Sequence, residues 1–378
     1  MLPLAGVKVV EIAQNLAGPF CGQVLAHLGA EVVKVERPEG GDDARHWGPP
    51  FIDGVSPSFH AINFAKRSIA LDLKDADQVA WLKSYLGGCD VLVQNLRPGV
   101  LEELGLGAET ITAAHPRLVY CSLWAMGRTG PRRLAPGYEP MVQAFSSLMW
   151  LSGEEGGPPT RMGTQVLDHG TGMWAAMGVL ALLFRRAATG RGGIVDTSLF
   201  ETALGWLTIP FSTYAVTGKA PSRHPTGSSR LVVFQGFETA DGPIVIAAAN
   251  DRLFGKLATA LGRTDWAADS RFKTNADRLA HRNELIPPLQ HLLLERGKAH
   301  WCDILEQAGV PAAPINTLEE MLADPQTAAT GMVQPAPGVA MRAIALPVQF
   351  DGVRPPLLGP APTLGQHTAE IVGKRHPD

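Results

Sequence analysis

The sequence predicts an α/β fold in which a parallel sheet carries helices on both faces. Short apolar runs of strand length alternate with segments of helical period over the first half of the chain, the pattern of repeated βαβ units. Hydrophobic residues make up 45% of the 378 residues, and the net charge is −3. These values are typical of a globular protein with room for one large or two medium domains.

The strand candidates follow one another in a regular order. VKVVEI (7–12) and EVVKVE (31–36) flank a loop and a helical segment, and a second helical pattern covers 75–86. Further strand candidates are found at 68–73, 90–96 and 118–123. We therefore expect a sheet of about five or six strands, because each helix connects two parallel neighbours.

The rest of the chain divides at a loop. An apolar helix around 172–184 precedes a glycine turn, a short strand and another helix, and then comes TGKAPSRHPTGSSR (217–230). Beyond this loop, 237–250 is typical of a hairpin with Asp241-Gly242 in the turn, and helical segments follow. We assign 1–205 and 330–378 to a large domain, and 206–329 to a linker and a small α+β domain.

Composition and charge exclude several classes of partner. Both signs of charge are scattered, so no basic stripe is present for nucleic acid or for an anionic membrane. The N-terminus lacks the pattern of a signal peptide, and the run 172–184 is shorter than a bilayer span. Cys21, Cys89, Cys121 and Cys302 form no CxxC pair. Reduced thiols, a cytoplasmic location and a small-molecule ligand are the expectation.

Basic residues border several strand candidates. Arg37, Lys66, Arg67, Lys74 and Arg97 stand where these strands begin or end. If they share the sheet edge at which ligands bind in open α/β folds, they can surround phosphates. Singly, each is more often a solvated surface charge.

The first βα unit is not a dinucleotide site. Glu36 closes the second strand candidate where an acid can bind a ribose, but the connecting loop contains the single glycine Gly18 instead of three.

Asp168 stands in front of the longest apolar stretch. An aspartate there is most often a helix N-cap. Gly163, Gly170 and Gly172 surround it, however, and such glycines weaken a helix unless a ligand must approach the backbone. A carboxylate beside free N–H groups would stay ionised and act as a nucleophile. His169 can be an acid/base partner, but neighbouring residues of a helix point in different directions. The sequence contains no GxSxG elbow and no HExxH motif.

The chain resembles the class III CoA-transferase family, the group of formyl-CoA:oxalate CoA-transferase, carnitine CoA-transferase and α-methylacyl-CoA racemase. Nine segments in order carry the resemblance. They include LAGPFCGQVLAHLGAEVVKVERPEGGDDAR, NFAKRSIALDLK, DVLVQNLRPGVLEELGLG, GRTGPRRLAPGYEPMVQAFSSLM, and the stretch from Asp168 to Leu204; the others are 239–254, 269–285, 308–327 and 356–368.

The resemblance implies a nucleophile, a ligand and an assembly. Asp168 matches the aspartate that attacks an acyl-CoA thioester and becomes an aspartyl-CoA thioester by way of mixed anhydrides. No metal or tightly bound redox cofactor is implied, because coenzyme A is itself a substrate. The implied fold is a Rossmann-like large domain with a small domain, in an interlocked homodimer. The positions that match CoA contacts are Leu16, Ala17, Arg37, Leu71, Asp72, Leu73, Lys74, Asn95, Leu96, Arg97, Pro136, Gly137, Tyr138 and Glu139.

Departures from the family pattern bear on the reaction. The racemase branch carries a histidine where this chain has Tyr138, and Gln14 replaces a histidine of the formyl-CoA branch. The expected activity is therefore CoA transfer from an acyl-CoA to a small, dicarboxylic acid. An acyl-CoA racemase or epimerase is the alternative within the family, and a non-catalytic nucleotide-binding Rossmann-like protein is the alternative from another class.

Overall fold

Two compact units make up the chain, of which the computed structural model describes residues 1–373. Unit 1 comprises Met1–Leu148, Met162–Thr208 and the chain from Pro325 on, and unit 2 comprises Met149–Arg161 and Ile209–Asp324. Contacts define these units. Whether each folds as an independent domain, with bounds at 205 and 330, stays a prediction.

Unit 1 is built around a six-stranded sheet in which all neighbouring strands pair in parallel. The strand order is β3-β2-β1-β4-β5-β6, and it reverses direction between β1 and β4. The predicted α/β fold with a parallel sheet is thus confirmed. The strands are β1 (Lys8–Ile12), β2 (Glu31–Glu36), β3 (Arg67–Ala70), β4 (Val91–Gln94), β5 (Val119–Trp124) and β6 (Gly193–Ser198).

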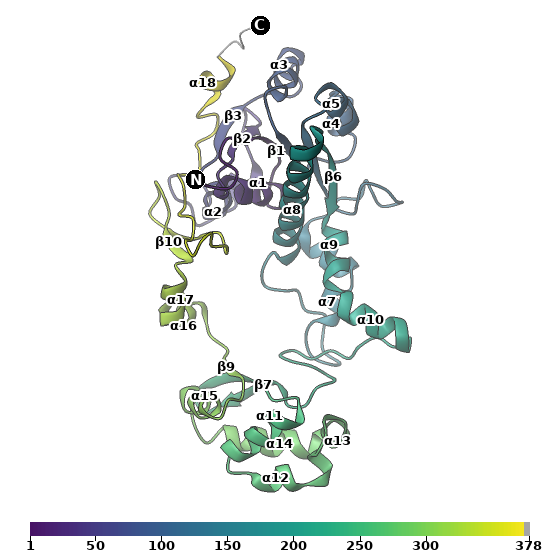
Figure 1. Cartoon of the computed structure of the whole chain (residues 1–378), viewed down its shortest axis with the longest axis vertical. Helices are drawn as coiled ribbons and strands as arrows, with labels where there is room; N and C mark the ends of the chain where they lie inside the picture. Colours follow the sequence, from purple (N-terminus) through teal and green to yellow (C-terminus); the bar gives the residue numbers. More distant parts are fainter. Residues whose placement is uncertain (374–378) are drawn as a thin grey trace. The chain divides into compact units, whose positions relative to one another are not determined.

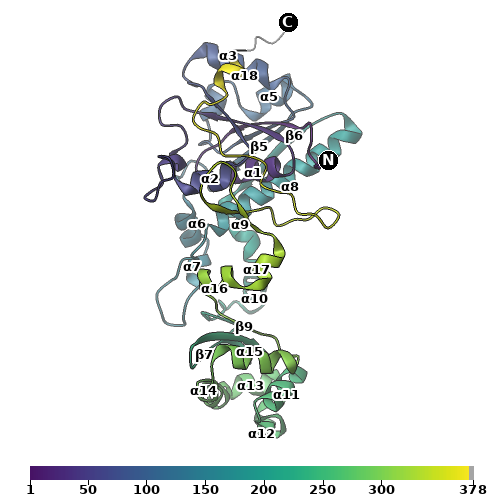
Figure 2. The ribbon, with the colours of Figure 1, turned by 90° about the vertical axis from the view of Figure 1, so that its left-hand side faces the viewer.

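Helices cover both faces of this sheet (Figures 1 and 2). Alternate residues of each buried strand point to opposite faces, so Val9 packs toward α1 and α8 while Val10 packs toward α3 and α5. The helical segments of unit 1 are α1 (Ala17–His27), η1 (Asp43–His46), α2 (Pro57–Asn63), α3 (Ala76–Leu86), α4 (Val100–Glu103), α5 (Ala108–Ala114), α6 (Glu139–Phe145), α7 (Leu148–Leu151, at the unit boundary), α8 (Val166–Thr189), α9 (Leu199–Trp206), α17 (Pro325–Thr330) and α18 (Thr368–Val372).

Helix α8 is longer than the apolar run that predicts it. It has 24 residues, and by length and composition alone it could cross a membrane. Leu167, Ala175 and Val179 are buried in the core that α8 shares with α1. The helix is therefore a core element of unit 1, and Figure 1 shows it beside α1. That the protein has no membrane partner stays a prediction.

The C-terminal segment returns to unit 1. Strands β10 (Val333–Pro335) and β11 (Arg342–Ile344) form a small antiparallel pair. Next to β3, the amide of His367 donates to Ser68 O over 2.9 Å, and the amide of Ala70 donates to Thr368 Oγ1 over 2.9 Å.

Unit 2 has its own core, formed by a three-stranded antiparallel sheet and helices. The predicted hairpin is present, with a small shift: Thr239 pairs with Gly242, so Ala240 and Asp241 form the turn and Gly242 begins the second strand. Its elements are α10 (Thr208–Thr217, at the unit boundary), β7 (Phe234–Thr239), β8 (Gly242–Ala247), α11 (Asp251–Ala260), α12 (Thr264–Ala268), η2 (Ser270–Phe272), α13 (Asn275–Ala280), α14 (Arg282–Leu293), α15 (Lys298–Gln307), β9 (Ala312–Pro314) and α16 (Leu318–Ala323).

Candidate active site

The loops after β1 and β4 meet where the strand order reverses, the position at which open α/β sheets bind ligands. The Asn95 side chain fastens them together. Its Oδ1 accepts from the amide of Gln14 over 2.8 Å, and its Nδ2 donates to Gln14 O over 2.8 Å. Asn15 follows with a φ of 65°, a conformation that asparagine tolerates, and its amide donates to Asp42 Oδ1 over 2.9 Å.

A buried ionic network lies beneath these loops. Lys34 Nζ is 2.9 Å from Glu11 Oε1 and 2.8 Å from Asp42 Oδ2, and Lys66 Nζ is 2.8 Å from Glu11 Oε2. Burial lowers the pKa of Lys66 to about 8, although the attraction of Glu11 opposes this shift. Removing one member would leave an uncompensated buried charge, so all members are held in place. Asp42 also accepts from the amide of Asn15, and the network therefore holds the loop after β1.

Two of the five predicted strand-end cations are wrong as phosphate ligands. Lys66 is buried against Glu11. Arg67 begins β3 and pairs with Glu31 and Glu370, so it stands at the opposite edge of the sheet. The spacing did not distinguish the two ends of a strand. Glu36 is not a ribose ligand either, because it is buried and its Oε1 lies 2.7 Å from the Arg45 guanidinium.

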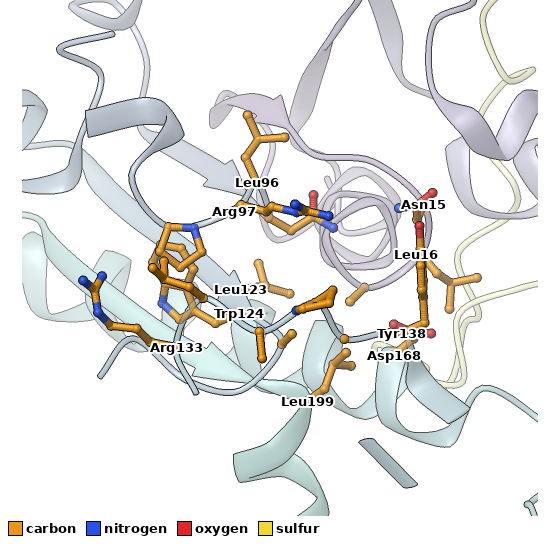
Figure 3. Close-up of a pocket in the computed structure, with 18 of the residues that line it drawn as sticks. Asn15, Leu16, Leu96, Arg97, Leu123, Trp124, Arg133, Tyr138, Asp168 and Leu199 are labelled. Atoms are coloured by element: carbon orange, nitrogen blue, oxygen red, sulfur yellow. The ribbon is translucent and has the colours of Figure 1, made fainter. Parts of the chain in front are cut away.

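A pocket of about 220 Å³ opens over these loops, and Asp168 forms part of its wall. Figure 3 shows Asp168 and Tyr138 together on one side of the pocket and Arg133 on the opposite side. The pocket is lined by Asn15, Leu16, Ala17, Trp47, Asn95, Leu96, Arg97, Pro98, Leu123, Trp124, Ala125, Arg133, Leu134, Ala135, Pro136, Gly137, Tyr138, Asp168 and Leu199.

A second pocket, of about 670 Å³, lies at the carboxyl ends of β1 and β2. Arg37 and the segment Leu71–Lys74 line it, and Leu96 lines both pockets. The Arg37 guanidinium is already bonded to Asp43 Oδ1, at 2.5 Å, and to Gly41 O. The two pockets together contain all the predicted site residues except Glu139.

Asp168 is the third residue of α8, and the N-cap position belongs to Gln165. The N-cap interpretation is therefore wrong. Glu139 instead accepts a hydrogen bond from the first turn of α8. Its Oε1 accepts from the amide of Leu167 over 3.0 Å and from Gln143 Nε2 over 2.9 Å. Glu139 is only 3% exposed and lines neither pocket, because the α6 start turns its side chain into the protein.

The expectation that Asp168 stays ionised needs correction. Burial and the neighbouring Glu139 carboxyl raise the pKa of Asp168 to about 7. A buried carboxylate loses hydration, and a second carboxyl nearby opposes its charge. These two effects outweigh the stabilisation that the N-terminus of α8 gives to a negative charge.

His169, the expected alternative partner, turns away from Asp168. Its Nδ1 is 2.9 Å from Gln165 O, and its ring packs edge-on against Phe20.

Gly170 and Gly172 allow helices to pack and do not open space for a ligand, whereas a Cβ on Gly163 would meet nothing within 4 Å. A Cβ on Gly172 would lie 2.7 Å from Ala17 O, and one on Gly170 would lie 2.9 Å from both Thr202 and Trp206 side chains. Gly172 thus lets α8 approach the first turn of α1, whose Leu16 and Ala17 border the pocket. Sequence spacing cannot separate these two uses of glycine.

A model of CoA-transferase family III matches residues 4–368 of this chain. The chain belongs to CoA-transferase family III. The resemblance seen in the sequence is confirmed.

Relatives and a solved structure agree with the family over nearly the whole chain. Succinyl-CoA:glutarate CoA-transferase of Mus musculus is 36% identical over 98% of this chain and 86% of its own length. Acetyl-CoA:oxalate CoA-transferase of Acetobacter aceti is 37% identical over 98% of this chain and 95% of its own length. The crystal structure of a CAIB/BAIF family protein from Brucella suis has 38% identity and a TM-score of 0.88, covering 98% of this chain and 99% of that one.

Sequence reasoning did not single out several residues of this family III pocket. Trp47 and Trp124 come from a loop and a strand end that no resembling segment includes. Arg133 lies in one of the resembling segments, but that segment does not indicate which of its side chains lines the pocket. The apposition of Glu139 and Asp168 was missed as well, since Glu139 was assigned to CoA. The sequence offered one signal, a glutamate at the first position of a helix, but that position alone does not identify what the side chain faces.

Proposed function

We propose that this member of family III transfers CoA from an acyl-CoA to a small dicarboxylic acid, with Asp168 as the nucleophile. One observation carries the proposal: the Asp168 carboxyl borders a pocket at the carboxyl ends of β1 and β4. The substrate class rests on the relatives, which are named for succinyl-CoA with glutarate and for acetyl-CoA with oxalate.

Coenzyme A would occupy both pockets. Arg37 and Lys74 border the larger pocket and supply positive charge for the phosphates of the nucleotide end. Leu96 lines both pockets, so the pantetheine arm would pass it and Arg97 to bring the thioester to Asp168. Asn95 has its side-chain amide engaged with Gln14, so its contribution is to hold the loop that CoA crosses.

The reaction would proceed through covalent intermediates on Asp168. The carboxylate attacks the thioester carbonyl, the C–S bond breaks, and a mixed anhydride and CoA thiolate form. The thiolate then attacks the aspartyl carbonyl and releases the donor acid, leaving an aspartyl-CoA thioester. The acceptor carboxylate attacks this thioester, its C–S bond breaks, and a second mixed anhydride and CoA thiolate form. The thiolate then attacks the acceptor carbonyl of this anhydride. The new acyl-CoA leaves and the Asp168 carboxylate is restored.

Backbone amides at the start of α1 suit the oxyanions of this sequence. The first amides of a helix have no intrahelical acceptor. Ala17 borders the pocket together with Asp168. A preorganised N–H donor at such a place contributes about 3 kcal/mol to stabilising a tetrahedral intermediate. The amides near Asp168 are less suited, because that of Leu167 donates to Glu139 and that of His169 to Gln165.

A racemase or epimerase activity is the alternative within the family. It requires two acid/base groups on opposite sides of the α-carbon. Tyr138 stands where the racemase branch has histidine, it is 64% exposed, and His169 faces Gln165 and Phe20. Washing of solvent deuterium into the α-carbon of a branched acyl-CoA would support this alternative.

A homodimer in the cytoplasm completes the proposal. Helix α10 has no buried residue although Ile209, Phe211 and Val216 are apolar, and α8 and α9 of unit 1 expose Trp174, Met177 and Trp206. Exposed apolar surface of this extent is typical of an interface. A second copy, interlocked with the first, would cover it. Among residues 1–373, no group of three or more His, Cys, Asp or Glu side chains is arranged to hold a metal.

Asp168→Asn tests the nucleophile. Turnover with succinyl-CoA or acetyl-CoA and a panel of dicarboxylic acids should fall by about 10⁴-fold or more, since a missing nucleophile is not replaced. Binding of CoA, measured by calorimetry, should remain. His169→Asn is the matched control on the next residue, and it should retain turnover within a few-fold. A fully active Asp168→Asn enzyme would overturn the proposal.

A further inference from the structure

Two buried lysines hold the connection from β1 to α1, one at each end. Lys34 Nζ donates to Ala13 O over 2.7 Å, directly after β1. Lys66 Nζ donates to Pro19 O over 2.7 Å, in the first turn of α1. Both lysine side chains are fully buried. A buried ammonium group requires acceptors for its protons, so each lysine fixes the carbonyl that it contacts.

Glu11 of β1 joins the two lysines. Its Oε1 lies 2.9 Å from Lys34 Nζ and its Oε2 lies 2.8 Å from Lys66 Nζ, so one carboxylate contacts both ammonium groups. Gly22 of α1 leaves the space for this carboxylate, because a Cβ there would lie 1.8 Å from Glu11 Oε2. We refer to Glu11, Lys34 and Lys66 as the lysine bridge. It sets how far apart the two ends of the connection lie.

The residues between the two ends belong to the candidate active site. Asn15, Leu16 and Ala17 line the pocket that Asp168 borders. The three residues of the lysine bridge line neither this pocket nor the larger one. The bridge therefore acts on the reaction only through the position of the connection. The Ala17 amide depends on that position, since a donor is effective only where the oxyanion forms.

We propose that the three residues of the lysine bridge are positioning residues for the acylation of Asp168. They keep the start of α1, and with it the Ala17 amide, at the place where the tetrahedral intermediate forms. This inference rests on the proposed function of Asp168. The bridge touches no substrate and takes part in no bond-making step, so its contribution is to the geometry of the site alone.

The charges of the bridge allow position to be tested separately from stability. Lys34 has a second anionic partner, Asp42, whose Oδ2 lies 2.8 Å from its Nζ. Lys66→Met alone leaves two buried carboxylates on one lysine, so its Tm should fall. Glu11→Gln together with Lys66→Met removes one charge of each sign. This double variant should recover most of the lost Tm, because neutral replacement of a whole buried ion pair is often tolerated.

The rate of Asp168 acylation is the readout. The protein is mixed with succinyl-CoA and hydroxylamine, and the gain of the hydroxamate mass on the Asp168 peptide is followed over time. The double variant lacks the bond to Pro19 O, so its labelling should be about 10²-fold slower than in the wild type. Free CoA should bind within a few-fold of the wild-type affinity, because Arg37 and Lys74 of the larger pocket lie on other loops.

A matched pair controls for the loss of a buried ion pair as such. Asp90 directly precedes β4, so it lies at the edge of the sheet opposite the pockets, and its Oδ1 is 2.9 Å from Arg186 Nη2. Asp90→Asn together with Arg186→Met should label at the wild-type rate. A control as slow as the test variant would overturn the proposal. So would recovery of the wild-type labelling rate together with the Tm in Glu11→Gln with Lys66→Met.

A second charge-matched pair keeps the test independent of whether the first one folds. Glu11→Gln together with Lys34→Met releases Ala13 O, the other end of the connection, and leaves Asp42 and Lys66 as opposite charges. Its labelling should also be about 10²-fold slower. Wild-type labelling in this folded variant would refute the positioning role and leave the proposed function intact. No labelling of Asp168 in the wild type would refute the proposed function, and this inference with it.

Discussion

Asp168 occupies surroundings that oppose its charge, and this has a thermodynamic consequence at the residue scale. Burial and Glu139 raise the pKa of Asp168 from 3.8 to about 7. Between these two pH values the folded chain binds more protons at this residue than the unfolded chain. The free energy of unfolding therefore falls as pH rises through this window, and the loss is complete above pH 7.

Replacement of Asp168 by Asn should stabilise the protein at pH 8. The neutral side chain removes the cost of an ionised carboxyl, which corresponds to about 4 kcal/mol for a pKa raised from 3.8 to about 7. Thermal unfolding at pH 8 should give a higher Tm for Asp168→Asn than for the wild type. At pH 4 the two values should converge, because Asp168 is then protonated. Such gains are typical of sites where function opposes stability.

The exposed Asp303 on α15 provides the control for this measurement. Asp303→Asn should give no stabilisation that grows from pH 4 to pH 8. Equal Tm values for wild type and Asp168→Asn at pH 8 would contradict the interpretation that the site destabilises a charged Asp168.

At the scale of elements, the close approach of α8 and α1 sets the pocket. Gly172 permits it, since a Cβ there would lie 2.7 Å from Ala17 O and 2.9 Å from the Phe20 ring. Backbone cannot yield as a flexible side-chain end can. A side chain at 172 must therefore move α8, with Asp168, away from Leu16 and Ala17.

Gly172→Val should lower both stability and turnover. Overpacking of this kind costs about 1 to 3 kcal/mol, and the displaced nucleophile should reduce kcat by about 10²-fold. Gly205→Ala on α9 is the matched control, because a Cβ there meets nothing within 4 Å. It should leave kcat unchanged and keep or slightly raise the Tm. A Gly172→Val enzyme with wild-type kcat would mean that the α8 to α1 distance does not position Asp168.

The elements also show where sequence patterns suffice. Buried parallel strands are apolar on both faces, so β1, β2 and β4 fall within the predicted runs. β3 is shorter than predicted, Arg67–Ala70 against 68–73, because pairing with β2 ends at Ala70. Gly170 and Gly172 were misinterpreted, since a glycine at a helix crossing and a glycine beside a ligand have the same signature in sequence.

At the scale of the whole molecule, the order of strands explains which site residues were predictable. Parallel strands bring their carboxyl ends to one edge, so Arg37, Lys74 and Arg97 line the two pockets there as the βαβ pattern predicts. Glu139 and Arg133 lie in the long connection between β5 and α8, where no period fixes the direction of a side chain. The prediction that Arg67 and Lys66 bind phosphate is wrong for a related reason, because both lie at the start of a strand instead of its end.

The proposed dimer provides the last prediction. Helix α10 exposes Ile209 and Phe211, and none of its residues is buried within the chain. Light scattering should give about twice the 40.3 kDa of one chain. The double variant Ile209→Glu and Phe211→Glu should shift the mass toward one chain, because two charges replace apolar area at the interface. Val353→Glu, at another exposed apolar residue, is the control and should stay dimeric. A wild-type mass of one chain, or a double variant that stays fully dimeric, would show that α10 is not covered by a second copy.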